Sequence, residues 1–170
     1  MKQRLFWLFI IVVVLLLQIV VLPYFFLERL KVDLIFLLVI AYALLKGSNE
    51  GLIFGLIAGF LCDCFIGQPF GLQIVLKALC GFAAGKLHDM YFENQLGVPI
   101  FAVSVLFVLN EIVQRICYWL FYGGVFWPKG AYWRGIGILF LQQLVIFGLL
   151  YYLVRYLLHW QSQGKALLKK

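Results

Sequence analysis

The sequence predicts an all-α polytopic membrane protein: one transmembrane domain, residues 1–170, built as a bundle of six transmembrane helices. Hydrophobic residues make up 65% of the chain and charged residues only 12%, whereas soluble domains carry about 25% charge. The mean hydropathy is +1.04. Long apolar runs follow one another along the chain, at about 5–22, 33–46, 51–65, 70–87, 98–122 and 135–158.

These runs leave little chain for anything else. We therefore expect neither a separate soluble catalytic domain nor a nucleic-acid-binding domain, and the formal charge of +7 is not a nucleic-acid footprint. The first run follows Lys2 and Arg4, as a secretory signal would. It exceeds the usual hydrophobic region of about 7–15 residues and lacks a small-x-small cleavage site, so we interpret it as a retained span.

The second run, 33–46, is short against the roughly 20 residues that cross a bilayer. To cross the membrane, this span must include flanking residues, or the bilayer must be thinner around it. Asp33 stands at its start and is predicted to be the N-cap of the helix.

The third and fourth spans form a hairpin with a stripe of small residues. Gly51, Gly55 and Gly59 are spaced by four, so each lies only about 40° around the helix from the last. Such a stripe lets another helix approach closely. We predict a partner-helix groove formed by Gly51, Gly55, Gly59, Asp63, Gly67, Pro69 and Gly71. Whether the helix in this groove belongs to the same chain stays open.

Asp63 is a charge where a membrane segment should avoid one, so it needs a structural or functional reason. It is a candidate ligand or proton site, a cap for the turn, or a partner for Lys77, about 10 Å of rise into the next helix. Intramembrane charges usually pair, which favours Lys77 as the partner.

The fifth span carries a polar face. Glu111 and Arg115 are spaced i, i+4 and can pair, while Asn110 and Gln114 fall on the same side. We expect this face to point into the bundle. The predicted intramembrane polar network comprises Asp63, Lys77, Asn110, Glu111, Gln114 and Arg115.

Two connecting segments and the basic residues predict the topology. The segment 86–95 looks solvated, and the aromatic segment 123–134 is expected to lie along the membrane surface. With six spans, both termini share a side, and eight basic residues would lie there against four on the other. This bias predicts cytoplasmic termini. The eight are Lys2, Arg4, Lys46, Lys86, Arg155, Lys165, Lys169 and Lys170; the four are Arg29, Lys31, Lys129 and Arg134.

The sequence contains no residue pattern typical of a catalytic site or a metal site. Neither the four cysteines nor the two histidines have the spacing of metal ligands, and free cysteines usually behave as small buried hydrophobes. Catalytic signatures such as a nucleophile elbow, HExxH or a phosphate loop are lacking. We therefore predict that the protein is not an enzyme and binds no cofactor or metal.

Together these residues resemble the MreD family of bacterial rod shape-determining proteins. The resemblance rests on Val32-Asp33-Leu34, on the stripe from Gly51 to Asp63, on Gly67-x-Pro69-Phe70-Gly71-Leu72, and on Gly81-x3-Gly85-Lys86. It covers nearly the whole chain. Two departures are Val32, where the family often has proline, and the two cysteines that flank Asp63.

The resemblance implies a multi-pass scaffold in the bacterial inner membrane. Such a protein would work in the cell-elongation machinery, or elongasome, with MreC, MreB, RodA and a class-B penicillin-binding protein, to control cell shape and lateral peptidoglycan synthesis. Under this interpretation the glycine groove and the turn 63–72 would hold a transmembrane helix of MreC.

A second interpretation belongs to another class of protein. A six-helix bundle of this size also resembles the membrane-embedded substrate-binding component of energy-coupling-factor vitamin transporters. Asp63, Lys77, Glu111 and Arg115 would then line a mostly apolar ligand pocket.

Overall fold

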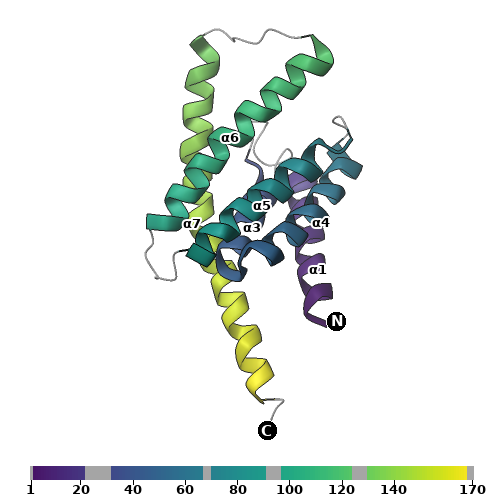
Figure 1. Ribbon diagram of the computed structural model, residues 1–170, viewed down its shortest axis with the longest axis vertical. Coiled ribbons are helices and arrows are strands. Elements are labelled where there is room, and N and C mark those ends of the chain that lie inside the picture. Colours follow the sequence, from purple (N-terminus) through teal and green to yellow (C-terminus); the bar gives the residue numbers. More distant parts are fainter. Residues whose placement is uncertain (1, 22–31, 67–69, 91–96, 124–129, 168–170) are drawn as a thin grey trace.

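The computed structural model describes residues 2–21, 32–66, 70–90, 97–123 and 130–167, and of these parts every regular element is helical (Figure 1). The helices are α1 (Lys2–Leu16) with its π-helical continuation η1 (Leu17–Val21), α3 (Leu34–Lys46), α4 (Ser48–Ile66), α5 (Leu72–Met90), α6 (Gly97–Tyr122) and α7 (Gly130–Leu167). The predicted all-α fold with six helices is confirmed. The number of membrane crossings and the side of the termini stay predictions.

Helix α3 is the centre of the fold. It contacts α1, α4, α5, α6 and α7, and every residue from Ile35 to Leu44 is buried. A helix that is apolar on all sides needs protein around it, and here its neighbours supply that cover. The structure thus explains why this span is short: α3 is enclosed by other helices, so its length need not match the bilayer.

Both ends of α3 are capped. The Asp33 carboxylate accepts a hydrogen bond of 2.9 Å from the Phe36 amide, which confirms the predicted N-cap. The Gln18 side chain, from the π-helical turn η1, accepts a second one of 3.2 Å from the Ile35 amide. At the other end, Gly47 has a φ of +92°, a conformation open mainly to glycine, which lets α4 begin at once.

Helices α4 and α5 form an antiparallel hairpin against α3, and α1 packs beside them (Figure 1). An aromatic cluster joins α1 to this core: the ring of Trp7 lies 4.8 Å from that of Tyr42, and Tyr42 stacks on Phe54 at 4.2 Å. Cys62 and Cys80 are buried, and the four cysteines are free.

Helices α6 and α7 flank this core and diverge toward the segment 124–129 that joins them (Figure 1). Together with α4 they contain stretches long and apolar enough to cross a membrane: Ser48–Phe65, Pro99–Phe121 and Gly137–Trp160. The apolar helices Leu5–Val21 and Leu34–Lys46 are shorter.

Helix ends differ from the predicted spans in two places. Helix α5 continues to Met90, so the first part of the predicted solvated segment 86–95 is helical. Helix α7 begins at Gly130 and ends at Leu167, so it extends beyond the predicted apolar run at both ends and residues 130–134 are helical. The position of the segment 123–134 along the membrane surface stays a prediction. The last turns of α5 and α7 are polar but still helical, and a hydropathy pattern does not mark a polar turn as part of a helix.

Candidate functional site

The glycine stripe of α4 faces α5 of the same chain. A Cβ atom on Gly51 would lie 2.5 Å from the carbonyl oxygen of Gly81, and one on Gly59 would lie 2.5 Å from that of Gln73. On Gly55 it would clash with the backbone carbonyl of Lys77. Backbones this close leave no room for a side chain or for a third helix.

This contact corrects the predicted partner-helix groove. Gly51, Gly55 and Gly59 are covered by α5, so they cannot receive a helix of another protein while the hairpin is intact. Gly81 and Gly85 on α5 complete the same seam against Gly51 and the α3–α4 junction. Gly67 and Pro69, also assigned to the groove, lie outside the described residues.

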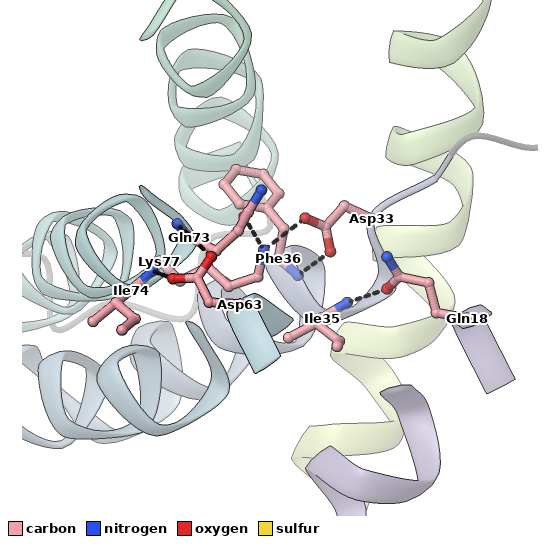
Figure 2. Close-up of polar contacts among 8 residues, drawn as sticks. All are labelled: Gln18, Asp33, Ile35, Phe36, Asp63, Gln73, Ile74 and Lys77. Atoms are coloured by element: carbon pink, nitrogen blue, oxygen red, sulfur yellow. Dashed lines mark hydrogen bonds and ion pairs between the residues drawn. The ribbon is translucent and has the colours of Figure 1, made fainter. Parts of the chain in front are cut away.

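Asp63 closes the hairpin by capping the start of α5 (Figure 2). Its carboxylate accepts hydrogen bonds from the amides of Gly71 at 2.9 Å, Gln73 at 3.2 Å and Ile74 at 3.1 Å. The first amides of a helix have no partners within it and carry its positive dipole end. Gly71 has a φ of +101°, which directs its amide toward the carboxylate.

The favoured pairing of Asp63 with Lys77 is therefore wrong, and the cap is the alternative that holds. Asp63 is buried, and three backbone amides satisfy its charge in place of a lysine. Asp63 lies near the end of α4, next to the first amides of α5. These amides are closer to its carboxylate than the side chain of Lys77, which lies further along α5.

Replacing Asp63 tests this cap. Asp63→Ala leaves the three amides of α5 without their acceptor, and we expect it to lower the free energy of unfolding by about 2 kcal/mol. Asp63→Asn keeps one carbonyl oxygen as an acceptor, so its free energy of unfolding should fall clearly less than that of Asp63→Ala. Unfolding of the purified variants in mixed micelles measures both, and equal losses for Ala and Asn would contradict capping.

Lys77 reaches instead to the start of α3 (Figure 2). Its Nζ donates to Asp33 Oδ2 at 2.8 Å and to Gln73 Oε1 at 2.8 Å. Only 2% of the Lys77 side chain is exposed. Asp33 thus uses one carboxylate oxygen to cap α3 and the other to bind α5, so a single side chain ties the central helix to the hairpin.

The opposite end of the hairpin has a second carboxylate cap. Asp89, exposed at the end of α5, accepts a hydrogen bond of 3.2 Å from the amide of Ser48 at the start of α4. Hydrogen bonds from Ser48 lower the pKa of the Asp89 carboxyl below its usual value. Each helix of the pair therefore ends in an aspartate that caps the other, and this fixes their register.

The predicted polar face of α6 is only partly buried. Asn110 is buried, but Glu111, Gln114 and Arg115 are half-buried, and Tyr118, one turn beyond Gln114 on the same side of the helix, is exposed. The expectation that the whole face points into the bundle is thus wrong for its outer part. Pairing of Glu111 with Arg115 stays a prediction.

The hydrogen bonds of Asp63 and Lys77 account for only part of the predicted polar network, and a meeting of its six residues in one site stays a prediction. Asp63 and Lys77 serve the hairpin, while Asn110, Glu111, Gln114 and Arg115 lie on α6. A groove between α1, α3 and α4 is lined by other side chains. Within the described parts of the chain, three or more metal-ligating side chains do not cluster anywhere.

Three site residues were not foreseen in these roles: Gln18, Gln73 and Asp89. One signal was present, because Gln73 and Lys77 are spaced i, i+4 on one helix. Gln18 and Asp89 act across 17 and 41 residues of chain, and no local pattern reports such contacts.

Comparison with known proteins identifies the family. The sequence model for the rod shape-determining protein MreD matches residues 1–159, which confirms the resemblance. Neither a curated protein nor a solved structure matches the chain.

Proposed function

Because the chain belongs to the MreD family of rod shape-determining proteins, we propose that it is a non-enzymatic scaffold of the bacterial inner membrane. It holds a transmembrane helix of MreC, and through this complex it positions MreB, RodA and a class-B penicillin-binding protein for lateral wall synthesis. A scaffold acts by differential binding, because holding a partner in one state shifts that partner's population.

The observation that carries this proposal is the half-exposed polar face of α6. Its candidate span is Pro99–Phe121, so Glu111, Gln114 and Arg115 lie near the middle of the bilayer. Polar and charged side chains at that depth are expensive unless protein covers them. The rest of this chain covers them only in part, so a helix of another protein completes the cover.

The end of α6 supports the same surface. Tyr118, Trp119, Leu120 and Phe121 are all exposed, and four successive residues cover every side of a helix. This last turn therefore stands away from the core, as α6 and α7 diverge in Figure 1. We define the α6 docking face as Glu111, Gln114, Arg115 and Tyr118. It replaces the glycine groove as the proposed site for MreC.

Photo-crosslinking in native membranes tests this face. Benzoylphenylalanine at Tyr118, which is 62% exposed, should crosslink to MreC. The same group at Phe60 on α4, 50% exposed and also aromatic, is the matched control and should not. Arg115→Leu should reduce the Tyr118 crosslink about fivefold to thirtyfold, because a polar contact between membrane helices contributes about 1–2 kcal/mol.

Two outcomes would overturn the proposed face. Crosslinking of MreC from Phe60 with equal yield would place the partner on the hairpin instead. An unchanged Tyr118 yield in Arg115→Leu would show that the polar face does not contribute to binding. The groove between α1, α3 and α4 is lined by residues other than the four proposed for the transporter alternative, so it does not favour that alternative.

A further inference from the structure

A groove of about 690 Å³ lies between α1, α3 and α4, apart from both the hairpin seam and the α6 docking face. Its size is that of a small-molecule site. It runs for about 10 Å of helix rise along α4, from Glu50 to Ile57. Helices α1 and α4, which form its two outer walls, lie side by side (Figure 1).

The outer edge of the groove is aliphatic and exposed, while Trp7, Tyr42 and Phe54 form its aromatic inner wall. Leu5 and Leu8 from α1 and Ile53 and Ile57 from α4 line it and are exposed. Branched aliphatic side chains of this kind make a surface suited to a hydrocarbon chain, and here that chain can enter sideways from the membrane.

One end of the groove is charged. Lys46, the last residue of α3, and Glu50, in the first turn of α4, both line it and are exposed. They lie where α1 begins and α4 begins, which is the end of the groove opposite Ile57. An ammonium and a carboxylate together at the end of an apolar groove match a molecule with an apolar tail and a head that carries both charges.

The groove also contains a buried tryptophan. Trp7 lines it and is 3% exposed, and its indole Nε1 has no hydrogen-bond partner within the described part of the chain. Buried donors of this kind usually find an acceptor. In Trp7 the ring is held by Tyr42 and Phe54 and the Nε1 atom is itself buried, so the ring forms an aromatic floor of the groove and its donor is closed off from a ligand there.

We propose that this groove binds one aminophospholipid of the surrounding membrane. Lys46 binds its phosphate, Glu50 accepts hydrogen bonds from its primary ammonium, and an acyl chain lies along α1 and α4 over the aromatic floor that Trp7 forms. Because the three walls come from different helices, the bound lipid ties α1 to the α3–α4 corner.

Native mass spectrometry of the full chain in detergent, titrated separately with three lipids of identical acyl chains, tests the proposal. Phosphatidylethanolamine should bind about tenfold more tightly than phosphatidylcholine, whose quaternary ammonium cannot donate a hydrogen bond, or phosphatidylglycerol, which has no cation. Lys46→Gln should weaken binding of all three lipids about tenfold. Glu50→Gln should remove the preference for phosphatidylethanolamine while the phosphate contact persists.

Lys86→Gln is the matched control, because Lys86 is an exposed lysine of α5 outside the groove; it should bind all three lipids as the wild type does. Equal affinity for the three lipids would overturn the proposal, and so would an unchanged preference in Glu50→Gln. A loss in Lys86→Gln equal to that in Lys46→Gln would show general attraction to phosphate and overturn it as well. Folding is checked by circular dichroism, and the preference within each variant is a ratio that does not depend on yield.

Discussion

Gly55→Leu is expected to prevent α4 and α5 from pairing. A Cβ at this position would clash with the backbone of Lys77 and Ala78, and backbone atoms cannot move aside as the end of a side chain can. Overpacking of a core costs about 1–3 kcal/mol when side chains yield, and we expect more here. The measurement is the yield of folded, monodisperse protein after membrane extraction, followed by its thermal unfolding.

Gly148→Leu on α7 is the matched control, because a Cβ at Gly148 has no atom within 4 Å. This variant should keep wild-type yield and stability. Gly55→Ala should be intermediate, since alanine gains about 1 kcal/mol of helix propensity but retains the clash. If Gly55→Leu were as stable as the wild type, α4 and α5 could not be in close backbone contact at Gly55. The glycine stripe would then again be a candidate site for a helix of another protein.

Lys77→Met is expected to lower the free energy of unfolding by about 3–5 kcal/mol. It leaves Asp33 with a charge at the start of α3 and without its cation, and removing one member of a buried pair costs about this much. Loss of this pair also removes a polar contact between α5 and the central helix, although the two helices still pack against each other. Unfolding in mixed micelles measures the effect against wild type.

The double variant Asp33→Asn with Lys77→Met is the control for this pair. Asparagine keeps an oxygen for the Phe36 amide, so α3 stays capped while the unpaired charge is gone. We therefore expect the double variant to be more stable than Lys77→Met alone. Additive losses from the two changes would show that Asp33 and Lys77 act independently.

Much of the fold could be predicted because it depends on local properties. The positions of the helices could be predicted from the apolar runs. Asp33 could be identified as an N-cap because the capping residue directly precedes the helix in the sequence. The family, too, could be identified from residues spaced along the chain, from Val32 to Lys86. Helix ends were less accurate, as α5 and α7 show, because their last turns are polar.

The sequence by itself determined that the chain is an all-α member of the MreD family with a tightly spaced glycine stripe and several isolated intramembrane charges. Only the tertiary structure decided which groups meet. Lys77 binds Asp33 from 44 residues away, Asp63 binds backbone amides, and α5 fills the stripe. The reason is physical: periodicity reports which side of a helix a residue occupies, whereas the partner on that side depends on how separate helices pack. Helix α3 is central because its neighbours enclose it. The sequence of its 13 residues shows that it is apolar on all sides, but it does not show which helices surround it.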